Sequence, residues 1–328
     1  MVRTHCWAVL EPAGKCARSG CRNPVVVAMA FCNAELLCNV VDPLAAIFMS
    51  ASIHSDLHCH SHFSDGSLSP EALLFLAQSR GVNQLAITDH DTVKAYSPAL
   101  AANAAELGVS LISGCELSCQ WQRRGIHIIG LNMNLEDTAF RQAMLQQAEA
   151  RGHRAEAIAR ALARLGFTVD LAQVQELAAP GILGRPHVAK HLVATGQQPS
   201  MAAAFKRVLG DGKAGDIKAN WPELETVVGW IVRAGGVAVL AHPLKYKVTL
   251  TKLRGLLDDF KQVGGQGIEV ISGHQEPSRV KTLSDLASRY DLHASMGSDF
   301  HTPGQPWADL GHIQSIPEGC KPIWQLWS

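Results

Sequence analysis

From residue 53 onward, short apolar runs alternate with amphipathic stretches along the chain. Several of these stretches open with helix-start signals, of which Ser69-Pro70-Glu71 is the clearest. The expected strands are Ile53–Cys59, Gln84–Thr88, Val109–Gly114, Ile126–Leu131, Val237–Ala241, Gly267–Ile271, His293–Gly297 and His312–Ile316. Alternation of this kind predicts an α/β fold with a parallel sheet, either open or closed into a barrel.

One long stretch interrupts the alternation. Between about residues 135 and 215 we find no run of strand type, and Ala139–Leu165 is rich in strong helix formers. Arg185–Ala194 and Met201–Leu209 also have helical character. We therefore expect a barrel made from residues 53–134 and 216–328, with residues 135–215 inserted as a helical subdomain.

The first fifty residues differ from the rest. Their apolar run Val25–Cys32 is too short to span a bilayer, and Glu11 together with the late position of the run makes a poor signal peptide. Met49 stands a few residues before the first expected strand. We expect residues 1–50 to be a poorly ordered extension or a misassigned start, without chemistry of their own.

Composition excludes several classes of protein. Lys and Arg number 29, as do Asp and Glu, and this zero net charge disfavours a basic chromatin-like binder. The nine cysteines are an odd number without a CxxC pair, which disfavours a disulfide framework and a structural zinc knuckle and predicts a cytoplasmic protein. No P-loop or GxSxG motif occurs, and the GxGxxG match at Gly210–Gly215 follows a helix, so we interpret it as a loop.

Acids and imidazoles recur where the apolar runs stop. The carboxyl ends of barrel strands meet at one face, so these side chains should converge there. They are Asp56, His58, His60, Asp65, Asp89, His90, Asp91, Glu116, His242, Asp299 and His301, and His127 joins them if its strand runs antiparallel to the others. A single buried histidine is usually satisfied by a hydrogen bond, but this many converging charges require a cation.

These motifs carry a resemblance to a known family. DLHCHSHFSDGSLSP, AITDHDT, GCELS, HIIG, LAHP and GSDFH resemble the polymerase and histidinol phosphatase (PHP) family of metal-dependent phosphoesterases, over about residues 53–316. SDGSLSPEAL, ILGRPHVAKHLV and KANWPELE are most similar to the branch of 3′,5′-nucleotide bisphosphate phosphatases and 5′→3′ exoribonucleases of short RNA. The resemblance implies a distorted (β/α)7 TIM-like barrel with a helical insertion.

The resemblance also implies three divalent metal ions and their ligands. The first set is His58, His60, Glu116 and Asp299; the second is Asp65, His90 and His301; the third is Glu116, His127 and His242, with Glu116 bridging. Imidazole and carboxylate ligands suit Mn²⁺, Fe²⁺ or Zn²⁺, and we take Mn²⁺ as the first expectation. Asp56 and Asp89 could orient imidazoles, and Cys59 should point to the opposite face and pack in the core.

Substrate residues are expected at the barrel mouth and in the insertion. The resemblance favours Arg185 and His187 as part of a lid that grips a phosphate, against the alternative of exposed charge at a helix start. Lys218, Lys245 and His274 are further substrate candidates, although each lysine could equally be a surface residue. The expected catalytic residues are Glu116, His242 and His301; both histidines are also proposed ligands, so the general acid stays unassigned.

The leading functional hypothesis is metal-assisted hydrolysis of a phosphate ester. One candidate activity removes the 3′-phosphate of a 3′,5′-bisphosphonucleotide, and the other degrades short 5′-phosphorylated RNA from its 5′ end. Both substrates present a 5′-phosphate and a 3′-phosphoryl group. The alternatives are a small-molecule phosphatase of the histidinol phosphatase type and a non-catalytic regulatory module, against which the complete ligand set argues. We expect no membrane association and no stable protein partner.

Overall fold

The computed structural model describes residues 54–218 and 221–327. The prediction for residues 1–50 lies outside the described residues. Over the part of the chain that is described, no helix combines the length and the apolar character needed to cross a bilayer.

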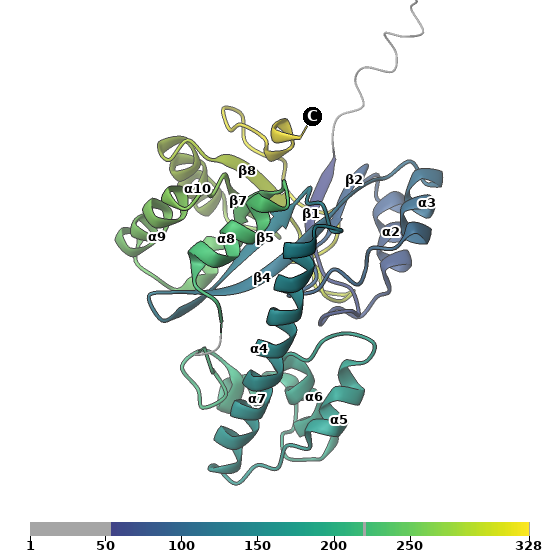
Figure 1. The fold of residues 1–328 in the computed structure, drawn as a ribbon, viewed down its shortest axis with the longest axis vertical. Coiled ribbons are helices and arrows are strands. Elements are labelled where there is room, and N and C mark those ends of the chain that lie inside the picture. Colours follow the sequence, from purple (N-terminus) through teal and green to yellow (C-terminus); the bar gives the residue numbers. More distant parts are fainter. Residues whose placement is uncertain (1–53, 219–220, 328) are drawn as a thin grey trace, which may run out of the picture. The chain divides into compact units, whose positions relative to one another are not determined.

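The described residues form eight strands in two sheets (Figure 1). The parallel sheet has the order β1-β2-β3, and the larger sheet has the order β4-β5-β6-β7-β8, in which β5 is antiparallel to both neighbours. This direction of β5 is the one that His127 needs to reach the expected site. The strands are β1 (Ser55–Cys59), β2 (Gln84–Ile87), β3 (Ser110–Ile112), β4 (Gly114–Trp121), β5 (Arg124–Leu131), β6 (Val237–Leu240), β7 (Gly267–Ser272) and β8 (His293–Gly297).

Helices pack on both sheets through separate apolar clusters. Helices α2 (Pro70–Ser79) and α3 (Pro98–Glu106) pack on β1 and β2, and Ser69 caps α2 by accepting a hydrogen bond from the Ala72 N–H. Helices α8, α9 and α10 pack on the larger sheet. Their bounds are α8 (Leu224–Arg233), α9 (Leu250–Gln262) and α10 (Pro277–Arg289), with short 3-10 turns at Pro243–Tyr246 and Ile323–Leu326.

The strands of the larger sheet are buried on both faces. In β6, Ala238 and Leu240 pack with the helices, whereas Val237 and Val239 join an inner cluster with residues of β1, β2, β3 and β5. Burial on both faces explains why this strand is apolar throughout, since alternate side chains point to opposite sides. The two sheets therefore share one inner core.

The two sheets meet at their edges without forming one continuous ladder in the described residues. Isolated bridges join Cys59 to Phe300 and His90 to Glu116, and the Asp299 N–H donates to the His58 carbonyl at 2.8 Å. The expected closed (β/α)7 barrel is thus not observed as such. Pairing stops where the polar motifs begin, and Asp299 there has a φ of 55°, which extended strands do not adopt.

Helices make up all the regular structure between Thr138 and Leu209. They are α4 (Thr138–Ala163), α5 (Leu171–Ala178), α6 (Arg185–Ala194), α7 (Met201–Ala204) and a π-helical turn at Phe205–Leu209. Phe140 near the start of α4 packs in the core of the larger sheet, whereas Ile158 and Leu162 near its end pack with α5, α6 and α7. Figure 1 shows α4 as a long helix that runs from the sheets to these shorter helices. Helix α4 therefore belongs to both cores.

Two expected strands need correction, and one helix was missed. His312–Ile316 is an irregular segment rather than a strand. Its apolar residues Ile313 and Ile316 pack against the core. The expected strand Val109–Gly114 is divided at Ser113, and a separate strand, β4, continues to Trp121. Helix α5 was not expected; its N-cap is Asp170, whose side chain accepts hydrogen bonds from the Ala172 and Gln173 N–H groups.

Candidate active site

All nine residues expected to bind metal lie in one cluster. Each makes at least one close side-chain contact with another member. They come from β1 and the loop after it, the loop after β2, strands β4 and β5, and the ends of β6 and β8: His58, His60, Asp65, His90, Glu116, His127, His242, Asp299 and His301. Elements from both sheets thus build one centre.

Glu116 lies at the middle of this cluster. Its Oε2 is 3.3 Å from the Nε2 atoms of His58 and His60 and 2.9 Å from His90 Nδ1. Its Oε1 is 2.8 Å from both His127 Nδ1 and His242 Nε2. The two oxygens therefore face different sets of imidazoles. The sequence had indicated that Glu116 lies at a strand end, but it lies within β4.

Five distances within one donor set are close to those between the ligands of a metal ion. The Nε2 atoms of His58 and His60 are 3.2 Å apart, and each lies 3.3–3.4 Å from Glu116 Oε2 and Asp299 Oδ1. Tetrahedral ligands placed about 2.0–2.1 Å from a central ion would be roughly 3.3–3.4 Å from one another. The compact group is His58, His60 and Glu116, and Asp299 lies outside it. Glu116 Oε2 is buried without a hydrogen-bond partner among the described residues. These residues fit a divalent ion.

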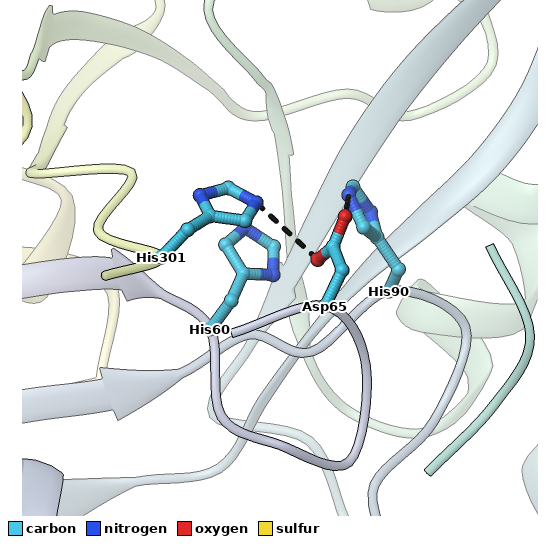
Figure 2. Close-up of side chains that lie close together, drawn as sticks. All are labelled: His60, Asp65, His90 and His301. Atoms are coloured by element: carbon cyan, nitrogen blue, oxygen red, sulfur yellow. Dashed lines mark ion pairs between the residues drawn. The ribbon is translucent and has the colours of Figure 1, made fainter. Parts of the chain in front are cut away.

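A second group surrounds Asp65 (Figure 2). Asp65 Oδ1 is 3.3 Å from His301 Nε2, and Asp65 Oδ2 is 3.9 Å from His90 Nε2. His60 completes this group, although it was expected only in the first set. A third group contains His90, Glu116 and His127. The third expected set contained His242 rather than His90. His242 contacts Glu116 but is not part of that compact group.

The charges of the cluster compensate one another. Burial alone would raise the pKa of Glu116, but His90, His127 and His58 hold it well below its ordinary value. Burial would lower the pKa of His301, but Asp65 and Asp299 raise it to about 9. The Glu116 carboxylate is thus ionised, and His58, His90 and His301, whose pKa values are raised, retain their protons, whereas burial lowers the pKa of His60 to about 3. Metal binding would displace those protons, which makes metal affinity depend on pH.

Glu269 is a buried member of the site that sequence reasoning missed. Its Oε1 accepts a hydrogen bond from His58 Nδ1 at 2.8 Å, and its Oε2 accepts one from the His242 backbone N–H at 2.6 Å. A carboxylate on the far nitrogen of a histidine fixes the ring and presents Nε2 to a metal. The available signal was a single acid inside the otherwise apolar strand β7.

Glu269→Gln should weaken metal binding. The amide oxygen can accept only one of the two hydrogen bonds that the carboxylate accepts, so His58 or the His242 loop loses its support. Loss of such a partner lowers metal affinity by about 10- to 100-fold. Competition titration with a chelator measures this, with the exposed Glu276→Gln as control. Unchanged affinity would mean that packing alone orients His58.

Two other acids orient backbone and hydroxyl groups rather than imidazoles directly. Asp56 accepts hydrogen bonds from the Ser298 and Gly311 N–H groups. Asp89 accepts hydrogen bonds from Ser61 and Ser64, and the Ser64 hydroxyl lies 3.4 Å from His60 Nδ1. Asp89 therefore acts on His60 at one remove. Cys59 is buried in the cluster with α2 and α3, as expected for a packing residue.

A cavity of about 690 Å³ extends from the cluster to the helical segment. Asp65, His90, His127 and His242 line one part of it. Its cationic lining residues are Arg124, Arg151, Arg154, Arg185, Lys218, Lys245 and Lys247. Of the expected substrate residues, Arg185, Lys218 and Lys245 line this cavity, with Lys245 Nζ paired to Asp299. Seven cationic side chains thus line the cavity together with three carboxylates, those of Asp65, Asp211 and Asp216.

Three of these cationic residues, Arg154, Arg185 and Lys218, lie near one carboxylate, that of Asp216, and we call them the cationic group. Asp216 lies 3.3 Å from Arg185 Nη1 and 2.8 Å from Lys218 Nζ. Arg154 lies in the same cavity, and its Nε donates to the Ile217 carbonyl. Burial and the neighbouring Arg185 and Arg151 lower the pKa of Arg154 to about 9. Burial is the largest cause of this shift, and the two neighbouring arginines add to it.

Two expected substrate residues do not line the cavity. His274 is exposed at the end of β7, where its N–H donates to the Trp307 carbonyl. His187 is buried, and its Nδ1 accepts a hydrogen bond at 3.0 Å from the N–H of Gly184, the N-cap of α6. His187 thus caps the helix that carries Arg185. Burial lowers the pKa of His187 to about 4.

This cap predicts a pH-dependent stability. The unfolded chain, with a histidine pKa of about 6.5, binds the proton more readily than the folded chain, so the free energy of unfolding falls as pH drops from 6.5 towards 4. We expect this residue to contribute roughly 2 kcal/mol of that loss. His187→Gln keeps an acceptor for the Gly184 N–H and does not titrate. Urea unfolding at pH 7 and pH 5 should therefore show a smaller loss for this variant, but not for the exposed His153→Gln.

The fold and the site together define a metal-dependent phosphoesterase. An imidazole–carboxylate cluster provides the metal donors, and a cation-lined cavity beside it suits phosphate groups. The family model described as the PHP domain matches residues 56–210. The chain belongs to the PHP family.

Three known proteins are similar to this chain over most of its length. A 3′,5′-nucleoside bisphosphate phosphatase from Chromobacterium violaceum is 38% identical over 82% of this chain and 95% of its own length. The 5′-3′ exoribonuclease Rnm from Escherichia coli is 40% identical over 83% of this chain and 93% of its own. A solved amidohydrolase structure from Chromobacterium violaceum, with bound sulfate and no metal, has a TM-score of 0.76 at 37% identity, covering 83% of this chain and 95% of that one.

Proposed function

We propose that this enzyme removes the 3′-phosphate of 3′,5′-bisphosphonucleotides and degrades short 5′-phosphorylated RNA from its 5′ end. The observation that carries the proposal is one cavity that is lined both by members of the metal-donor cluster and by a cationic group. The cationic group suits the 5′-phosphate, and the cluster suits the phosphoryl group attached at the 3′ position. The names of the two similar enzymes support the same pair of substrates.

The charge of the cationic group fits a terminal phosphate. Arg154, Arg185 and Lys218 carry three positive charges against the one carboxylate of Asp216, which leaves a net charge of +2. A phosphomonoester carries about −1.5 to −2 at neutral pH, whereas an internal phosphodiester carries only one negative charge. Arginine can also bind two phosphate oxygens at once. This balance favours a 5′-monophosphate as the anchoring group.

Three divalent ions are proposed for the cluster, with Mn²⁺ ahead of Fe²⁺ and Zn²⁺. When bound, they supply neutralisation of the phosphoryl oxygens and activation of a water for in-line attack. Glu116 would join two donor sets through its separate oxygens, and Glu269 would hold the His58 ring. His242 and His301 are the proposed candidates for the general acid, which stays unassigned between them.

The proposal also covers the barrel, the helical segment and the location of the protein. The shared inner core supports describing residues 53–134 and 216–328 as a distorted (β/α)7 barrel. Residues 135–215 would act as a lid, since they supply Arg154 and Arg185 to the cavity. The free thiols of Cys59, Cys115 and Cys119 support a cytoplasmic location.

A substrate panel tests the function. Metal is removed with a chelator and Mn²⁺, Fe²⁺ or Zn²⁺ is restored, and adenosine 3′,5′-bisphosphate, histidinol phosphate and 5′-phosphorylated oligoribonucleotides are compared by kcat/KM. We expect activity only with restored metal and a clear preference for substrates with a 5′-phosphate. Preference for histidinol phosphate would instead indicate the small-molecule phosphatase, and inactivity on every substrate would indicate the non-catalytic module.

A further inference from the structure

Asp91 and Arg151 form a buried ion pair that belongs to neither the donor cluster nor the cationic group. The Arg151 Nε and Nη2 atoms both lie 2.7 Å from Asp91 Oδ2. The side chain of Asp91 is fully buried and that of Arg151 is 8% exposed. Asp91 follows β2, whereas Arg151 lies on α4, so the pair joins the sheet region to the helical segment.

On one side the pair is tied to the donor cluster. Asp91 follows His90 directly, and its backbone N–H donates to the Glu116 carbonyl at 2.9 Å. Asp91 Oδ1 accepts a hydrogen bond from the Ser118 N–H at 2.6 Å, and Ser118 pairs with His127 between β4 and β5. Gln147 of α4 adds a hydrogen bond to the same oxygen. Asp91 thus contacts the backbone that positions three members of the cluster.

On the other side the pair is tied to the cationic group. Arg151 Nη1 donates to the Leu183 carbonyl at 3.2 Å, and Leu183 precedes the N-cap of α6, where Arg185 begins the helix. The guanidinium groups of Arg151 and Arg154 both lie over the Trp221 ring, 5.5 and 5.1 Å from its centre. Arg151 therefore fixes the chain that presents Arg185 and shares a stacking partner with Arg154.

We propose that Asp91 and Arg151 are positioning residues that fix the distance between the metal-donor cluster and the phosphate-binding group. The inference rests on the proposed function, because the distance matters only when one substrate binds at both ends. A rigid connection would select two phosphates separated by one ribose, since an error of about 1 Å in placement can cost 10²-fold in rate. Neither residue needs to touch the reacting phosphoryl group.

A double-mutant cycle tests the connection. With adenosine 3′,5′-bisphosphate, we expect Arg151→Gln to lower kcat/KM by about 30-fold alone but less than about 3-fold in an Arg185→Ala background, since coupled residues are not additive. With an aryl phosphate, which lacks the second phosphate, the loss should be under about 3-fold in either background. Arg160→Gln, an exposed arginine of the same helix, is the matched control. Metal content and melting temperature are measured for every variant.

The same data separate the possible failures. Equal losses of kcat/KM in both backgrounds would overturn the positioning role while leaving the function in place. So would a loss of bound metal that lowers kcat/KM with both substrates. A wild-type enzyme that does not prefer the bisphosphate would overturn the proposed function before any variant is compared. If Arg151→Gln does not fold, Arg151→Lys replaces it, because one ammonium group keeps the charge but cannot reach both Asp91 and Leu183.

Asp91→Asn distinguishes positioning from direct contact with substrate. This variant removes the partner of Arg151 but keeps the guanidinium in the cavity. A positioning pair predicts that Asp91→Asn reproduces the loss seen with Arg151→Gln on the bisphosphate. Full activity of Asp91→Asn would mean that Arg151 binds the phosphate itself, and the proposal would be wrong.

Discussion

Glu116→Gln should abolish most of the activity and part of the metal content together. Its two carboxylate oxygens face separate donor sets, with Oε2 towards His58, His60 and His90 and Oε1 towards His127 and His242. The amide of Gln has one oxygen and one NH₂ group, and the NH₂ group donates hydrogen bonds. One of the two donor sets therefore loses its anionic ligand. We expect kcat to fall by about 10³-fold or more, as for loss of a major electrostatic contribution to the transition state.

The measurement combines steady-state kinetics with elemental analysis of the metal content. The variant should bind fewer ions per chain than the wild type, independently of any assay of turnover. Glu136→Gln is the control, because that glutamate is exposed and pairs only with Arg141 in the described residues. Normal metal stoichiometry with nearly normal turnover would show that Glu116 does not bridge.

The chain order of the motifs made the centre predictable. Side chains at the carboxyl ends of parallel strands meet at one edge, so His58, His90 and His242 could be brought together without knowledge of loop structure. His127 required one more condition, an antiparallel strand, and β5 meets it. Motif spacing carries this information because strand geometry repeats every two residues.

Other features depend on contacts that no local pattern contains. Glu269 lies 211 residues from its partner His58, and in the sequence it is one acid in an apolar strand. His187 stands beside Arg185, yet it points towards the helix start and caps it, because the N3 position of a helix favours that hydrogen bond. The separation of the two sheets likewise depends on backbone turns at the polar motifs, such as that at Asp299, and not on apolar periodicity.

Arg185→Ala should weaken hydrolysis of a bisphosphorylated nucleotide by about 10- to 150-fold in kcat/KM, since a charged hydrogen bond is worth roughly 1.5–3 kcal/mol. Arg185 lines the cavity from the helical segment, and it shares Asp216 with Lys218. Its loss leaves Asp216 and Lys218 as a neutral pair, with Arg154 as the remaining cation of the group. The net charge of the group then falls from +2 to +1, too little for a phosphate dianion.

The comparison of two substrates gives this prediction its meaning. An aryl phosphate has no second phosphate to anchor, so its hydrolysis and the metal content should stay close to wild type. Arg207→Ala is the matched control, because that arginine lies in the same helical segment but is exposed and stacks on Phe167 outside the cavity. An equal loss on both substrates would mean that Arg185 serves the fold or the reacting phosphoryl group. Anchoring by the 5′-phosphate would then have to come from Arg154 and Lys218 alone.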